Sequence, residues 1–266
     1  MFARGAGPVV GMDEAHNNYH TLDTGLSSLA SLLRQDGFIV QKNFSKFTVG
    51  SLKELDVLVI VNPLHRSNLK EWSLPCPSAF SASEIGALKD WVLNGGRLLL
   101  VADHMPIAGA VQDLASEFGV EWANCFDFSI KKHWPPGQFS RRNQTLLSSP
   151  LTDSSTFMYE INLVGTFTGS AFKSEVLIPL LQFDHSYVLK YPKTAWQFSK
   201  KTRSHNAGGW LQGAYGRFGD GKVVFLAEAA MFTSQLRNKT KIGLNSEDVP
   251  DNKLFALNIF RFLSTD

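Results

Sequence analysis

The chain has 266 residues, of which 44% are hydrophobic and 19% charged, and its formal net charge is +2. This composition lies in the range of soluble globular proteins. Because 26 basic residues nearly balance 24 acidic ones, the charge gives no reason to expect nucleic acid or an anionic membrane as a partner. We interpret the short basic pairs as solvated surface: Lys131-Lys132, Arg141-Arg142 and Lys200-Lys201.

The two cysteines, Cys76 and Cys125, match no metal or redox spacing, which disfavours a disulfide scaffold and a zinc ribbon. The first residues contain no apolar segment of the length that a secretory signal requires, and no later run approaches a membrane span. We therefore expect a soluble protein in the cytoplasm.

Strand-like and helix-like segments alternate over the first 120 residues. Short apolar runs at Pro8–Met12 and 38–42 predict strands, and Asp56–Pro63 is a continuous apolar run typical of a strand buried on both faces. Residues 24–37 predict a helix that ends at Gly37. Its apolar face is made of four leucines, Leu26, Leu29, Leu32 and Leu33.

The next helix begins with a capping box, in which Ser81 and Glu84 satisfy first-turn amides, and Gly95-Gly96 ends it. Residues 97–103 predict another buried strand, and Ala108–Phe118 predicts a further helix. This repeated β-α-β pattern indicates an α/β fold with a parallel sheet between two layers of helices. The inward residues of the two helices are expected to be Ile85, Leu88 and Val92 in the first, and Val111, Leu114, Ala115 and Phe118 in the second.

From about residue 120 to 221 the pattern changes to short strands, turns and aromatic residues. We interpret this stretch as an antiparallel, β-rich insertion in a single α/β domain that spans residues 1–266. The segment 222–232 then returns to the buried-strand pattern, and residues 251–263 predict a well-buried closing helix.

Polar side chains follow four of the predicted strands. Ligands of open parallel sheets bind beyond the carboxyl ends of the strands, so these side chains are candidates for a common site. They could also be helix caps or residues held by nearby backbone groups. The candidates are Asp13, Glu14 and His16 after the first strand, Asn62 after residues 56–61, Asp103 and His104 after residues 97–102, and Glu228 after residues 222–227.

No glycine-rich phosphate loop follows a strand, so we expect no nucleotide cofactor, and no Ser or Cys stands in a nucleophile elbow. Metal or acid-base chemistry remains. His16 and His20 are spaced i, i+4, which would place both on one face of a helix, and with Asp13 they could hold a divalent ion such as Ca, Zn or Mn. Four residues are candidates for the chemistry or for taking a proton from metal-bound water: Asp103, His104, Glu228 and Glu14.

Six segments of the sequence together resemble an uncharacterised group of proteins with the class I glutamine-amidotransferase-like fold. They are "DEAHNNYHT", "DVLVIVNP", "FSASEIGALKDWVLNGGRLLLVADHMPIAG", "GTFTGSAF", "QGAYGRFGDGKVVFLAEAAMFTSQL" and "DNKLFALNIFRFL". This fold class includes trehalose-utilisation-type proteins and sugar-binding-like domains of gliding-motility and intraflagellar-transport proteins. The resemblance implies a three-layer, flavodoxin-like sheet. Because Asp103 and His104 occupy the turn where glutaminases have their Cys nucleophile, it does not imply glutaminase activity.

Three functions are compatible with these residues. The first, which we favour, is a metal-assisted hydrolase of a small ester, lactone or amide, for example a lactonase. The second is a non-catalytic module that binds a carbohydrate or another small molecule through aromatic residues such as Trp196, Trp210 and Tyr215, and through amides, namely Asn17, Asn62 and Gln212. The third is a scaffold with a protein-binding surface near Pro75, Pro77 and residues 133–139. The substrate and a homo-oligomeric state stay open.

Overall fold

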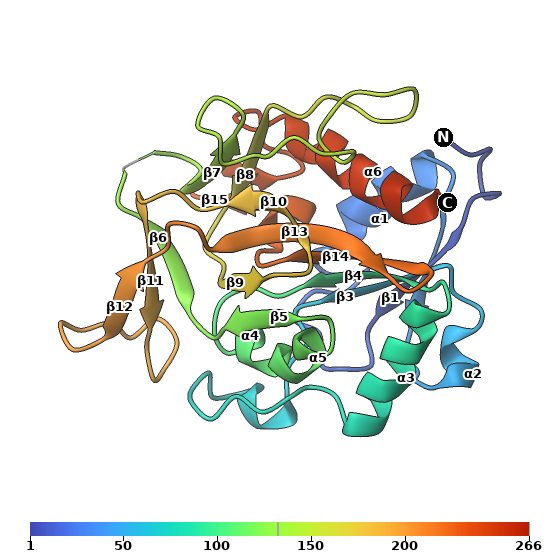
Figure 1. Cartoon of the computed structure of the whole chain (residues 1–266). Coiled ribbons are helices and arrows are strands. Elements are labelled where there is room, and N and C mark those ends of the chain that lie inside the picture. Colours follow the sequence, from blue (N-terminus) through green and yellow to red (C-terminus); the bar gives the residue numbers. More distant parts are fainter. Residues whose placement is uncertain (132, 266) are drawn as a thin grey trace.

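The structure of the protein is a computed structural model that describes residues 1–131 and 133–265. Its centre is a nine-stranded sheet with the order β2-β1-β3-β4-β14-β13-β9-β5, in which β10 also pairs with β13 (Figure 1). Five neighbouring strands are parallel: β2 (Ile39–Asn43), β1 (Val9–Asp13), β3 (Val57–Val61), β4 (Arg97–Val101) and β14 (Gly221–Leu226). This confirms the predicted α/β fold with a mostly parallel sheet.

Helices cover both faces of the sheet (Figure 1). One face carries α1 (Ser27–Gln35) and α6 (Asp251–Ser264), and the other carries α2 (Val49–Leu52), α3 (Ala82–Leu93), α4 (Ile107–Ala110) and α5 (Gln112–Ser116). Each layer has its own apolar core, with Leu29 and Phe255 in the first and Leu88 and Leu114 in the second. All five residues of β3 are buried, because helices pack on both of its faces.

The helix predicted over Ala108–Phe118 is divided, and α4 and α5 meet at Val111. One cause is competition for a helix carbonyl: the backbone N–H of Ala79 donates to the Ala110 oxygen at 2.9 Å. In α3 the capping box is present in both directions, as predicted. The inner stripe differs, since Ile85 is half-buried and Glu84 is buried.

Antiparallel strands continue the sheet beyond β14. The long β13 (Leu211–Phe218) pairs with β14, β9 (Ala171–Ser174) and β10 (Ile178–Gln182), and β9 pairs with β5 (Val120–Ala123). A separate three-stranded sheet projects from the molecule and consists of β12 (Arg203–Asn206), β11 (Tyr187–Tyr191) and β6 (Phe126–Ser129) (Figure 1). The assignment of residues 1–266 to one domain with an insertion stays a prediction.

Two further hairpins and two short 3-10 helices complete the described chain. The hairpins are β7 (Gly137–Ser140) with β8 (Leu163–Thr166), and β15 (Ser234–Arg237) with β16 (Thr240–Gly243). The 3-10 helices are η1 (Arg66–Asn68) and η2 (Ala230–Phe232). Among the described residues, no helix combines the length and the apolar character needed to cross a bilayer.

Candidate functional site

Asn62 and Asp103 meet at the carboxyl edge of the sheet, where β3 and β4 lie side by side. The Asn62 Nδ2 donates to Oδ2 of Asp103 at 2.8 Å, and the Asp103 backbone N–H donates to Oδ1 of Asn62 at 3.0 Å. Asn62 has a φ of +50°, a left-handed conformation that Asn tolerates better than most residues. This sharp turn directly after β3 brings the amide to the end of the neighbouring strand.

The second oxygen of the Asp103 carboxylate accepts a hydrogen bond from the backbone N–H of Ala229, at 2.5 Å. Burial raises the pKa of Asp103 to about 6, although the hydrogen bonds from Asn62 and Ala229 act in the opposite direction. The residue as a whole is half-buried. Asp103 is therefore a carboxyl group held in one orientation, on a partly exposed residue, and it titrates close to neutral pH.

His104 follows directly and presents a neutral imidazole. Its Nδ1 lies 2.7 Å from the carbonyl oxygen of Met105, which can only accept, so Nδ1 carries the hydrogen. Burial lowers the pKa of His104 to about 4, although the bond to Met105 raises it. At neutral pH, Nε2 consequently offers a lone pair, and no residue in the described ranges hydrogen-bonds to it.

Aromatic rings surround this imidazole. Phe126 stacks on it with 4.2 Å between ring centroids, Trp196 meets it edge-on at 4.7 Å, and Trp72 lies at 5.9 Å. The ring of Tyr19 in turn contacts Trp72 at 5.6 Å. Trp196 and Tyr19 are 51% and 56% exposed, so large apolar surfaces face solvent beside two hydrogen-bond acceptors. We call Tyr19, Asn62, Trp72, Asp103, His104 and Trp196 the rim site.

Two further carboxyl groups lie behind the rim site. Glu228, beyond the end of β14, accepts hydrogen bonds from the backbone N–H groups of Ala230 and Met231 at 2.8 and 3.2 Å. Its pKa is raised well above the ordinary value by burial and by the negative charge of Asp103. Asp127, on β6, accepts from the Gly169 N–H at 2.5 Å and from Nε2 of Gln212 at 3.3 Å.

Burial raises the pKa of Asp127 to about 7, with the charge of Asp103 adding to the effect. Among the described residues, no Lys or Arg forms an ion pair with Asp103, Asp127 or Glu228. The sequence analysis missed Asp127, because it stands between two phenylalanines inside a strand and not at the end of one. The only signal was a charged residue within an otherwise aromatic segment.

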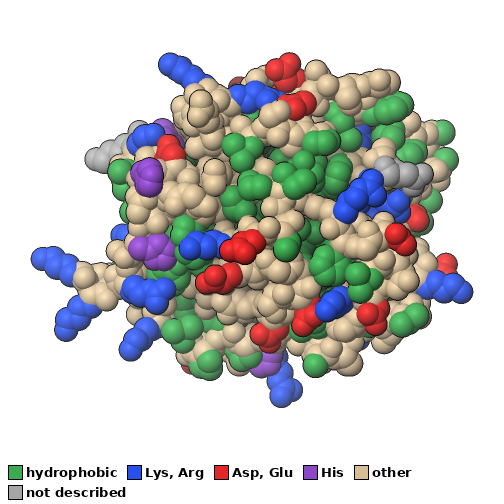
Figure 2. Space-filling view, in the orientation of Figure 1, with side chains coloured by type: hydrophobic (Ala, Val, Ile, Leu, Met, Phe, Trp, Pro, Cys, Tyr) green, Lys and Arg blue, Asp and Glu red, His purple; other side chains and the backbone are tan. Residues whose placement is uncertain are grey.

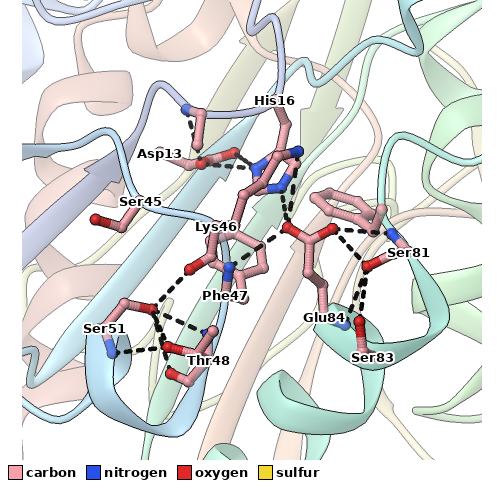
Figure 3. A network of polar contacts seen from close by, with 12 residues as sticks. Asp13, His16, Ser45, Lys46, Phe47, Thr48, Ser51, Ser81, Ser83 and Glu84 are labelled. Atoms are coloured by element: carbon pink, nitrogen blue, oxygen red, sulfur yellow. Dashed lines mark hydrogen bonds and ion pairs between the residues drawn. The ribbon is translucent and has the colours of Figure 1, made fainter.

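Asp13, His16 and Glu84 form a second, closed cluster (Figure 3). Nδ1 of His16 lies 2.9 Å from both Asp13 oxygens, and Nε2 lies 2.8 Å from Oε1 of Glu84. Phe47 and Phe80 pack against the imidazole with ring centroids at 4.5 and 4.7 Å. Both nitrogens of His16 are therefore engaged by protein carboxylates, and metal binding by Asp13 and His16 stays a prediction.

Glu84, predicted only as a cap, also serves as a partner of this imidazole. Burial alone would raise its pKa, but hydrogen bonds from His16 and Ser81 outweigh burial and lower the pKa to about 2. The separation of 68 residues between His16 and Glu84 hides the contact from any local motif.

His20 does not join His16 on one helix face, because residues 14–20 are not helical. Its ring lies against Gly25, where a Cβ would approach Nδ1 to 2.4 Å. Glu14 accepts the Leu22 N–H at 2.8 Å and lies 3.9 Å from Lys42, so it secures the loop after β1, and its catalytic role stays a prediction. In the ranges 1–131 and 133–265, no group of three or more His, Cys, Asp or Glu is arranged to hold a metal ion.

The predicted binding residues are dispersed. Asn17 donates through Nδ2 to the Leu64 carbonyl at 3.1 Å and secures a turn. Trp210 packs against Lys173 and His205, and Tyr215 packs against Phe262 at 5.3 Å on β13. Only Asn62 and Trp196 join the rim site, while Gln212 is buried beside Asp127.

Comparisons with known proteins show similarity of fold. No protein-family model matches the sequence, and no curated protein matches it. Among solved structures, the mmIFT52 N-terminal domain is 16% identical over 97% of this chain and 98% of that one, with a TM-score of 0.68. A ThuA-like protein from Bacteroides uniformis is 14% identical over 99% and 94%, with a TM-score of 0.52. A cytoplasmic protein from Salmonella typhimurium is 12% identical over 97% and 99%, with a TM-score of 0.51.

Proposed function

We propose that the rim site binds a small, hydroxyl-rich molecule of the carbohydrate class. The observation that carries the proposal is the juxtaposition of the Asp103 carboxylate and the His104 imidazole with the exposed ring of Trp196. Carbohydrates combine hydroxyl groups with apolar ring faces, and a site of acceptors beside an indole matches both. The resemblance of the sequence to an uncharacterised group, whose wider fold class includes sugar-binding-like domains, supports the same conclusion, and we propose that the chain belongs to that group.

The charges of the rim site favour neutral hydroxyl donors over anions. Because pH 7 is above the Asp103 pKa of about 6, this carboxyl group is mostly ionised and accepts hydrogen bonds. Nε2 of the neutral His104 also accepts them. Asp127 and Glu228 add negative charge behind them whenever they ionise. A phosphate or carboxylate placed directly on Asp103 would meet like charge without a compensating cation, so we expect the group bound there to be neutral.

Hydrolysis at the same site is a second candidate, and the raised pKa of Asp103 favours it. A carboxylate with a pKa of about 6 is a better general base for water than one with an ordinary pKa, and the hydrogen bonds from Asn62 and Ala229 hold it in one orientation. The substrate would be a small ester, lactone or amide. A metal-assisted form would need ligands other than Asp13 and His16, since these two are bound to each other.

Isothermal titration calorimetry with a panel of neutral mono- and oligosaccharides tests the binding proposal. Trp196→Ala removes the exposed ring, and Asp103→Asn keeps the shape but removes the charge. We expect each to weaken binding by about tenfold or more, as loss of an aromatic anchor or a charged hydrogen bond does. Trp210→Ala, an aromatic residue outside the rim site, is the matched control and should leave the affinity unchanged.

The same panel extended with esters and lactones separates binding from catalysis. If Asp103 acts as a base, product will form with the wild type and Asp103→Asn will abolish it, with a rate that rises through pH 6. Saturable heat without any product assigns the rim site to binding alone. Absence of both heat and product across the panel would refute the carbohydrate proposal.

A further inference from the structure

The projecting hairpin of β11 and β12 concentrates positive charge. Residues 187–206 contain four lysines and one arginine and no Asp or Glu, whereas the whole chain has a net charge of only +2. Figure 2 shows Lys and Arg side chains reaching into solvent on the side of the molecule where these strands lie. We call this segment the basic hairpin; its charged residues are Lys190, Lys193, Lys200, Lys201 and Arg203.

Most of these cations are free of carboxylate partners. Lys190 is half-buried over the rings of Phe128 and Phe198, at 5.3 and 5.6 Å. The other four are exposed, and none forms an ion pair within the part of the chain that the structure describes. Uncompensated charges of one sign raise the local concentration of oppositely charged ligands, and this effect weakens as salt screens it.

A hollow of about 370 Å³ lies within the basic hairpin. Lys193, Lys201 and Arg203 line it together with hydroxyl groups of the connecting loop, such as those of Thr194 and Thr202. Arg203 is held over the ring of Tyr191, with 4.3 Å between Cζ and the ring centroid, so this guanidinium has a support that fixes its place. Three cations with hydroxyl donors in one concave surface suit an anionic group.

The loop between β11 and β12 carries residues of both the hollow and the rim site, and it is tied to the segment of Trp72. The Ala195 N–H donates to the Trp72 carbonyl at 2.7 Å, and the Leu74 N–H donates to the Lys193 carbonyl at 2.9 Å. Trp196 follows in the same loop and meets His104. Lys193 lies three residues before Trp196, so their Cα atoms are at most about 11 Å apart, a span that two or three sugar rings cover.

We propose that the ligand is an acidic oligosaccharide, with a neutral ring at Trp196 and Asp103 and with sulfate or carboxylate groups in the hollow of the basic hairpin. This inference rests on the proposed function and narrows its ligand class. The opposite charges of the rim site and the basic hairpin determine the order of groups that we expect along the ligand. The Asp103 carboxylate of the rim site disfavours an anion there. The basic hairpin favours an anion a few residues away.

The test compares three oligosaccharides of equal length, one neutral, one sulfated and one containing uronic acids, by calorimetry at about 0.05 M and about 0.3 M salt. The hairpin variant is Lys193→Ser/Lys201→Ser/Arg203→Gln. Its matched control, Lys53→Ser/Arg142→Gln/Lys253→Ser, removes the same charge from exposed positions elsewhere. Circular dichroism confirms that both variants are folded.

We expect at least one acidic oligosaccharide to bind about tenfold more tightly than the neutral one at low salt, and to lose this advantage in the hairpin variant but not in the control. The sulfated and uronic arms identify which anion the hollow prefers. Equal affinity of neutral and acidic ligands would overturn the inference and leave the proposed function standing. Acidic ligands that bind undiminished to Trp196→Ala would also overturn it, because the hairpin would then act apart from the rim site. If no oligosaccharide binds in either salt, the proposed function fails and this inference with it.

Discussion

The side chain of Asn62 holds Asp103 in place across two parallel strands: its amide donates to the Asp103 carboxylate at 2.8 Å and accepts from the Asp103 backbone N–H at 3.0 Å. The pair fixes the direction of the carboxylate without using a cation. Each Asp103 oxygen accepts one hydrogen bond from the described residues, one from Asn62 and the other from Ala229. A second lone pair on each oxygen can therefore accept from a ligand. A preorganised acceptor of this kind costs a ligand less than one that must be ordered on binding.

Replacement of Asn62 tests this relationship. Asn62→Gly removes the amide while relieving the left-handed conformation at φ +50°, whereas Asn62→Ala removes the amide and adds strain. Because the Asn62 bond lowers the pKa of Asp103, we expect the pKa to rise above about 6 in both variants. Carboxyl carbon NMR titration measures it. An unchanged or lower pKa would contradict the role of Asn62, and urea unfolding should show a larger loss of stability for Asn62→Ala.

Asp127 makes stability depend on pH. A carboxyl group whose pKa is higher in the folded than in the unfolded chain binds more protons when folded, so the free energy of unfolding falls as pH rises between the two values. For Asp127 this window runs from the ordinary 3.8 to about 7. Asp127→Asn keeps an acceptor for Gly169 and Gln212 but cannot ionise.

We therefore expect Asp127→Asn to gain stability relative to the wild type as pH rises from 5 to 8. Chemical denaturation at several pH values measures the difference between the two proteins, which isolates Asp127 from other titrating groups such as His104. A difference that is flat with pH, or that grows toward acid, would show that Asp127 is not held at a raised pKa.

The contact of Glu84 with His16 predicts a contribution to stability that, unlike that of Asp127, is lost as pH falls. Glu84→Gln removes one carboxylate beside a buried imidazole that Asp13 still contacts, and losing a hydrogen bond of a charged group costs about 1–3 kcal/mol. Because the pKa of Glu84 is lowered to about 2, its contribution should be present above pH 4.5 and lost as pH falls toward 2. Thermal unfolding at several pH values measures the loss of stability and its pH dependence. The control is Ser83→Ala, an exposed change in the same helical turn, which should have little effect on stability.

The protonation state of His104 is a fourth expectation. The bond from Nδ1 to the Met105 carbonyl and the lowered pKa of about 4 predict a neutral ring with its hydrogen on Nδ1 at pH 7. Nitrogen-15 NMR of labelled histidine distinguishes the two ring nitrogens directly. A midpoint near 6.5, or a hydrogen on Nε2, would remove the free lone pair on which the rim site depends.

Much of the parallel half of the sheet could be predicted from the sequence, because its signals are local. The apolar run at β3 and the capping box at Ser81 define elements through neighbouring residues alone. The divided helix could not be predicted, since the Ala79 N–H that competes for the Ala110 carbonyl lies 31 residues away in the sequence. The spacing of apolar residues in this helix does not depend on whether the Ala79 N–H bonds to the Ala110 carbonyl.

The candidate site was predictable in part. The rule that ligands bind beyond parallel strands places Asn62 and Asp103 at one edge of the sheet, where the structure has them hydrogen-bonded. It could not show that His16 is enclosed, because its partner Glu84 comes from a distant helix and was already explained as a cap. Asp127 and Trp72 reach the site from segments that end no parallel strand, so only the tertiary structure reveals them.

The most direct test of a carbohydrate site at the rim is an NMR titration that follows the indole N–H signals of the six tryptophans. We predict that a saturating oligosaccharide shifts the Trp196 and Trp72 signals and leaves Trp210 unmoved, and that Asp103→Asn suppresses the shifts. Shifts confined to Trp210, or a bound ligand that leaves Trp196 unchanged, would contradict the account.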